Sequence, residues 1–159
     1  MTTQVTLPTE QDQANNRRRI LDFEATMFAA AASGELPPCD FPLQHTFTEG
    51  AYARQMTIPA GSVIIGKIHR HAHFNFILKG HVKVMTDAGV QELKGPCYFV
   101  STPGTKRVVT ALEETLWVTI HVTESQDLAE IEQQIIASSF ADLQLPVAAQ
   151  LPELERTSI

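Results

Sequence analysis

The chain has 159 residues, of which 43% are hydrophobic, enough to bury the core of one domain with extensions. Its 12 basic and 18 acidic residues give a formal net charge of −6, which argues against general affinity for nucleic acid or for anionic membranes. The two cysteines, Cys39 and Cys97, lack metal-site or disulfide spacing, so we expect buried, reduced thiols and a cytoplasmic protein.

The N-terminal region is predicted to be a tail followed by one helix. Residues 1–13 are rich in Thr and Gln and show no periodicity, which is typical of a mobile tail or of an arm that becomes ordered only against a partner. Apolar residues at helical spacing predict a helix from about 16 to 32, capped by Asn15 or Asn16 and ended by Ser33-Gly34. The apolar side of this helix must pack against another part of the protein.

The middle of the chain has the pattern of an all-β domain. Short β-branched and aromatic runs are separated by turn signals at intervals of about 8 to 12 residues. Strands are predicted at 43–48, 51–58, 62–69, 73–79, 81–86, 90–94, 97–100, 105–111 and 115–122. This number of strands would close, or nearly close, a small barrel.

The C-terminal region returns to a helical pattern. Thr123-x-x-Gln126 indicates a capping box, and an apolar stripe follows it. Residues 140–159 are too apolar for a free tail and too broken by prolines for one helix, so we expect them to lie extended across a surface, either of this chain or of a partner. The predicted organisation is therefore a tail and helix in 1–40, a barrel in 41–122, and a helix and apolar tail in 123–159.

A polar row interrupts the apolar strands between Gly61 and Gly80. Every second residue of this stretch is polar and would share one face of an extended chain: Lys67, His69, His71, His73 and Asn75. The apolar side chains of the same stretch would share the opposite face: Ile68, Phe74, Phe76 and Leu78. Such a row indicates a metal-capable or ligand-binding surface.

The spacing of this row resembles the first motif of the cupin superfamily, G-x5-H-x-H-x3,4-E-x6-G. With Gly61 and Gly80 as the flanking glycines, Lys67 stands at the first histidine, His69 at the second and His73 at the glutamate. In the second motif, G-x5-P-x-G-x2-H-x3-N, Gly95 and Gly104 match with one extra residue between them, and Arg107 stands at the histidine. The resemblance covers roughly 44–122 and implies a jelly-roll, or double-stranded β-helix, barrel, and a homo-oligomer, either a dimer or a larger assembly. The N- and C-terminal helices predicted from periodicity would flank this barrel.

Four short segments are similar to a narrower subgroup of small single-domain cupins, often encoded by bacteriophages and prophages and generally without an assigned activity. They are Gly66-Lys67-Ile68-His69, His73-x-Asn75, Gly104-Thr105-Lys106-Arg107 and Trp117-Val-Thr-Ile-His121. The likeness adds phage structural proteins to the partners to be considered.

The resemblance implies that His69 and His73 point into the barrel from adjoining strands, while His71 lies exposed at the turn between them. Because Trp117, Thr119 and His121 alternate on one strand face, His121 is the third candidate ligand. Three neutral imidazoles suit a divalent transition metal such as Zn, Fe, Ni or Mn. Asn75 on the same face would orient a water or a histidine.

Lys67 and Arg107 replace two metal ligands of the family by cations. An anionic small molecule bridging both cations and the metal would balance their charge, or the pocket would bind the anion without metal. A third alternative is a lysine whose pKa is depressed by burial, so that it acts as a base or a ligand. A fourth is that both cations pair with acidic residues, for which the candidates are Glu92, Glu113 and Glu114.

Two functions remain open. The first is a small cupin-domain protein that binds a divalent metal, a small anionic ligand or both inside the barrel. The second is a non-enzymatic accessory or virion structural protein of a phage, virion-associated, that uses the barrel and its tails for assembly. The large aromatic residues Trp117, Phe99 and Phe74 are expected in the core, and His81 is expected at the surface.

Overall fold

The structure is a computed structural model, and it describes residues 7–37, 39 and 41–143. It contains two α-helices, one 3-10 helix and eleven strands in these residues. The helices are α1 (Glu10–Ala32), α2 (Leu128–Ile135) and η1 (Phe140–Asp142). The strands are β1 (Leu43–Thr48), β2 (Ala51–Ile58), β3 (Val63–Ile65), β4 (Ile68–His69), β5 (His73–Lys79), β6 (His81–Thr86), β7 (Gly89–Lys94), β8 (Cys97–Ser101), β9 (Val108–Ala111), β10 (Thr115–Val122) and β11 (Ile136–Ala137).

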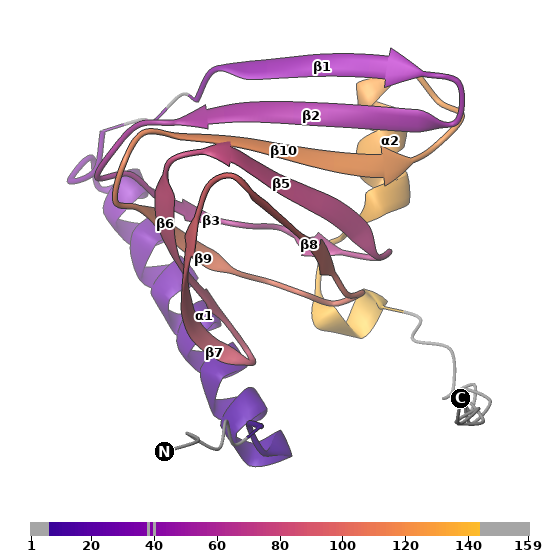
Figure 1. Cartoon of the computed structure of the whole chain (residues 1–159). Coiled ribbons are helices and arrows are strands. Elements are labelled where there is room, and N and C mark those ends of the chain that lie inside the picture. The colour runs from indigo at the N-terminus through magenta and orange to yellow at the C-terminus, as the bar shows by residue number, and fades with distance from the viewer. Residues whose placement is uncertain (1–6, 38, 40, 144–159) are drawn as a thin grey trace, which may run out of the picture.

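Two antiparallel sheets face each other across the core (Figure 1). One has the order β1-β2-β10-β5-β8, and the other has the order β3-β9-β6-β7. From β2 onward the chain crosses repeatedly from one sheet to the other, so strands from its two halves alternate within each sheet. This winding is that of a jelly roll, or double-stranded β-helix, and it confirms the predicted fold class.

The sheets do not close into a barrel, contrary to the nearly closed barrel that the strand count suggested. In the described residues, β8 and β1 are edges of the five-stranded sheet, and β3 and β7 are edges of the other. Aliphatic side chains and one tryptophan fill the space between the sheets: Ile58, Ile77, Val82, Val84, Val109, Ala111 and Trp117. Phe99 packs against this core as predicted.

The five-stranded sheet turns its polar row inward. Along β5, His73, Asn75 and Ile77 are buried, whereas Phe74 is 50% exposed. The expectation that Phe74 belongs to the core is therefore wrong, because a period of two places it on the outer face with Phe76 and the exposed Leu78. The buried residues of β5 instead face the cavity between the sheets.

The predicted strand at 62–69 is broken into β3 and β4. Gly66 comes so close to β9 that its N–H donates to the carbonyl of Arg107 at 2.8 Å, and a Cβ at this position would lie 3.3 Å from the Arg107 Cγ. Before Gly66, β3 pairs with β9. After Gly66, β4 leaves that sheet and pairs with β11, with His69 opposite Ile136. The break ends the strict alternation that linked Lys67 to the histidines.

Helix α1 begins earlier than predicted, because Thr9 and Asp12 form a capping box and the helix takes up residues 10–13 of the expected tail. Residues 1–6 lie outside the described part. The predicted end at Ser33 is confirmed. The helix crosses the outside of the four-stranded sheet (Figure 1), where Ile20 is buried and Glu24 pairs with the buried Lys106 at 2.7 Å.

Helix α2 is capped by Asp127, whose carboxylate accepts from the backbone N–H of Glu130 at 2.8 Å, and not by the predicted box at Thr123. The expected extended tail falls mostly in 144–159, outside the described residues. Both cysteines are free, but Cys39 is exposed and not buried as expected. Neither described helix is long and apolar enough to cross a bilayer.

Candidate metal centre

Three histidines meet at one end of the space between the sheets, and two of them, His69 and His73, line the cavity there. His69 ends β4, His73 begins β5 after a short turn, and His121 lies near the end of β10. Because Ile120 pairs with Phe74 in the ladder of β10 and β5, the next inward positions are His121 and His73. The start of β5 and the end of β10 lie together at the right-hand end of Figure 1, close to α2.

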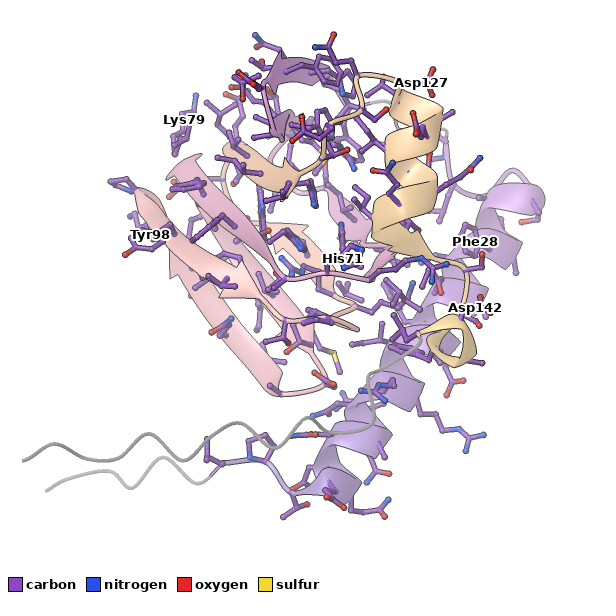
Figure 2. The ribbon with its side chains drawn as sticks, turned by 90° about the vertical axis from the view of Figure 1, so that its right-hand side faces the viewer. Phe28, His71, Lys79, Tyr98, Asp127 and Asp142 are labelled. Carbon is purple, nitrogen blue, oxygen red and sulfur yellow. The ribbon has the colours of Figure 1, made fainter. Side chains whose placement is uncertain are left out.

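The three rings are close enough to share one ion. Ring centroids are 4.2 Å apart for His69 and His73, 4.6 Å for His73 and His121, and 5.5 Å for His69 and His121. One nitrogen from each ring lies within 4.8 Å of the others. By contrast, His71 is exposed at the turn, as predicted, at the end of the molecule that faces the viewer in Figure 2.

The rings are neutral at physiological pH, as metal ligation requires. Burial, together with the neighbouring His73 and His121, lowers the pKa of His69 to about 3. Burial also lowers the pKa of His121 to about 4, and it lowers the pKa of His73. Because none of the three imidazoles carries a positive charge, they do not repel one another and can lie close together.

The hydrogen bonding of His73 tests whether a metal fits. Its Nδ1 lies 3.3 Å from the carbonyl oxygen of His71, which accepts if that nitrogen carries the proton. Its Nε2 is buried and has no partner among the described residues. A buried nitrogen lone pair without a donor is costly, and a metal ion would satisfy it. The donor set thus suits a divalent transition metal.

Asn75 connects the histidines to a buried arginine. Its Oδ1 accepts from Arg107 at 3.2 Å and from the indole of Trp117 at 3.1 Å. Its Nδ2 donates to the Ser101 hydroxyl at 2.8 Å and toward the His73 backbone carbonyl at 3.4 Å. Asn75 therefore orients Arg107 and the β5 backbone, and among the described residues it makes no hydrogen bond to a histidine ring.

The two predicted cations have different surroundings. The Lys67 ammonium is exposed and pairs with Glu132 of α2, whereas Arg107 is buried and bonds to Asn75 and Ser101. Neither pairs with Glu92, Glu113 or Glu114, because His81 takes Glu92 and Lys79 takes Glu114. Both Lys67 and Arg107 nevertheless line the cavity.

Two side chains of β2 were missed by the sequence analysis. Arg54 lines the cavity. Tyr52 is buried, stacks on His121 with centroids 6.1 Å apart, and its hydroxyl lies 2.7 Å from the His45 Nδ1. The sequence shows that Tyr52 and Arg54 share one face of β2. It does not show that β2 pairs with β10, and this pairing is what brings the two side chains close to the histidines.

The fold and the site together define a small protein of the cupin fold with a cluster of three histidines, of which His73 and His121 are buried and His69 is half-buried. No protein-family model and no curated protein sequence matches the chain. The solved structures similar to it include KdgF from Halomonas sp., with 18% identity and a TM-score of 0.47 over 57% of this chain and 91% of that one.

Two further similar structures are described as cupins. An RmlC-like cupin from Shewanella frigidimarina has 15% identity and a TM-score of 0.46 over 55% of this chain and 78% of its own. An RmlC-like cupin with a double-stranded β-helix fold from Methanocaldococcus jannaschii has 12% identity and a TM-score of 0.46 over 54% and 82%. Likenesses this low say nothing about activity, and the fold assignment rests on the strand order and the motif spacing.

Proposed function

We propose that the protein binds one divalent transition metal through His69, His73 and His121. The observation that carries the proposal is the buried Nε2 of His73, which has no described partner and lies in a cluster of neutral imidazoles. Three protein ligands leave coordination positions for water or a small ligand. A metal bound there would act as a Lewis acid on an oxygen atom of that ligand.

The surrounding residues support a binding role for the cavity. Tyr52 stacks on His121 and limits its rotation, and the turn carbonyl of His71 sets the orientation of His73. Trp117 is buried beside Asn75 and lines the cavity. These residues therefore position the ligands, while the cavity leaves space for a small molecule.

Elemental analysis tests the metal proposal. The protein is purified without a chelating tag, analysed, and analysed again after chelation and reconstitution with Zn²⁺, Mn²⁺, Fe²⁺ or Ni²⁺. We expect about one equivalent of metal in the wild type and none in the His69→Ala, His73→Ala double variant. His81→Ala is the matched control, because that ring pairs with Glu92 at 3.1 Å outside the cluster. A folded wild type that holds no metal even after reconstitution contradicts the proposal.

A second candidate function is favoured by the outer face of the five-stranded sheet. Apolar side chains gather there on β5 and β8: Phe74, Phe76, Leu78, Tyr98 and Val100. Phe76 stacks on Tyr98 with centroids 5.8 Å apart, and Tyr98 is 69% exposed. Tyr98 stands on the side of the molecule away from α2 (Figure 2). We propose that this outer sheet face serves self-assembly, which is the part of an accessory or virion role that these residues support.

A further inference from the structure

The charged side chains that line the cavity next to the histidines are all basic. It measures about 180 Å³, and its lining includes Arg54, Lys67 and Arg107 but no aspartate or glutamate among the described residues. The whole chain, by contrast, carries a formal charge of −6. A cationic cavity in an acidic protein selects an anion, since cation-lined walls of low dielectric strengthen attraction to negative charge.

Arg107 is the strongest part of this argument. It is only 8% exposed, and its described hydrogen-bond partners, Asn75 and Ser101, are both neutral. Its guanidinium lies 5.6 Å from the Phe99 ring and 5.7 Å from the Trp117 ring. Burial lowers its pKa to about 10, so the group still carries its charge at neutral pH. A buried cation without a counter-ion is unfavourable, and the remaining N–H donors of the guanidinium can bind an anion.

Arg54 lines the same cavity from β2, which is separated from β5 by β10. The ladders place it opposite Thr119, and Thr119 opposite Asn75, so all three lie in one row across the sheet. The charge of Arg54 also contributes to the lowered pKa of His69 and of His121. Among the described residues no carboxylate lies within ion-pair distance of Arg54, whereas Lys67 already has Glu132. Arg54 and Arg107 are therefore the two cations open to a ligand.

The rest of the wall limits the body of that ligand. Beyond the row of Arg54 the lining is apolar, from Met56, Ile58, Ile64, Val109 and Trp117. A volume of 180 Å³ holds about six waters at roughly 30 Å³ each. An anion with a short hydrocarbon chain fits such a space, while a nucleotide is too large and a sugar would leave hydroxyl groups against apolar walls.

We propose that the cavity binds a short aliphatic carboxylate, with its carboxylate between Arg54 and Arg107 near the three histidines and its chain against Met56, Ile58 and Trp117. This deepens the proposed function, because a carboxylate held there is the small ligand that a bound metal would meet. The binding itself depends on the two arginines, and so metal-free protein also binds the carboxylate.

Calorimetry with defined probes tests the proposal. Acetate, butanoate, hexanoate and octanoate are titrated into metal-free and Zn²⁺-loaded protein, and butanamide and butylammonium serve as neutral and cationic analogues of butanoate. Emission of Trp117, the only tryptophan, gives a second readout inside the cavity. We expect butanoate or hexanoate to bind best in both forms, with the two analogues at least tenfold weaker.

Single-charge variants assign the binding to the arginines. Arg54→Gln and Arg107→Gln are expected to weaken butanoate binding at least tenfold. Lys79→Gln removes one positive charge at the exposed pair with Glu114 and is expected to change the affinity less than twofold. Should Arg107→Gln fail to fold, Asn75→Asp replaces it, because a carboxylate beside Arg107 supplies the counter-ion internally and should abolish butanoate binding.

Each outcome separates this proposal from the metal proposal. Butanoate binding to metal-free wild type, lost in the arginine variants, supports the carboxylate site even if no metal binds. Metal binding without any carboxylate binding overturns this inference and leaves the metal centre standing. Equal binding of butanoate and butanamide, or affinities unchanged in Arg54→Gln and Arg107→Gln, also overturns it.

Discussion

Asn75 is the side chain on which the interior hydrogen bonds converge, and its removal should be costly. It is fully buried and bonds to Arg107, Trp117, Ser101 and the backbone of His73. In Asn75→Ala the Arg107 and Trp117 N–H groups lose their acceptor, at about 1–3 kcal/mol each. With the lost side-chain contacts, we expect the free energy of unfolding to fall by about 3–5 kcal/mol, a large part of the ~5–15 kcal/mol of a typical domain.

Asn75→Asp separates the loss of acceptor from the loss of volume. Aspartate keeps an oxygen toward Arg107 and Trp117 and adds a negative charge beside the buried cation, so its cost should be well below that of alanine. Gln55→Ala is the control, because it removes a hydrogen bond to Gln44 in the same sheet outside the cavity and should cost about 0.5 kcal/mol or less.

Urea unfolding followed by far-UV circular dichroism and by the emission of Trp117 measures these differences. Because Trp117 donates to Asn75, its emission should shift in Asn75→Ala before any unfolding. A loss below about 1 kcal/mol in Asn75→Ala, or equal losses in the alanine and aspartate variants, would refute the role given to this amide.

Three further predictions follow from charges and exposed surface. Below pH 6.5 an unfolded His121 takes up a proton that the folded chain does not bind until about pH 4, so in metal-free protein His121 should contribute a loss of stability of about 1.4 kcal/mol per pH unit as pH falls through this window. His69 and His73, whose pKa values are also lowered, add to the slope, so His121→Gln should make urea-derived stability less steep against pH without abolishing the slope, and an unchanged slope would contradict this. Glu24→Gln leaves Lys106, which is only 8% exposed, without its carboxylate partner and should lower the unfolding free energy by about 3 kcal/mol. Glu114→Gln, at the exposed pair with Lys79, is the control and should lower it by less than ~1 kcal/mol. Equal losses in the two variants would argue against a buried pair. We expect a homo-oligomer formed through the outer sheet face, so Tyr98→Asp should reduce the mass measured by light scattering, and a wild type that is already monomeric would reject this assembly.

Strand positions in the barrel region were largely predictable from the sequence. Turn residues such as Glu49-Gly50 and Asp87-Ala88-Gly89 punctuate alternating runs, and most predicted strands lie within a residue or two of the observed ones. The strand at 62–69 failed because the close approach of Gly66 to Arg107 is a tertiary event. The start of α1 failed because the signal of Thr9 and Asp12 was read as part of a tail.

The candidate site was predictable in its histidines but not in its charges. A period of two on one strand brings out His73 and Asn75, and the family spacing adds His69 and Arg107. From alternation alone, a strand with one apolar and one polar face is expected to bury the apolar face. The family resemblance instead implied that His73 points inward, and the structure agrees: His73 and Asn75 line the cavity, while Phe74 is half exposed. Arg54 becomes a site residue only through the pairing of β2 with β10.

The two-residue strand β11 connects the last part of the described chain to the histidine cluster, because it pairs with β4, which carries His69. Only β11 pairs with β4 in the described residues, and Arg70, directly after His69, donates to the carbonyl oxygens of Ile136 and Asp142 at 2.8 Å each. Few backbone bonds hold such a segment, so it belongs to the parts of a fold that open first. Because coupling between sites is reciprocal, a metal that immobilises His69 should slow amide exchange at 135–137. By the same reasoning, a change that separates β11 from β4 should lower the affinity for metal.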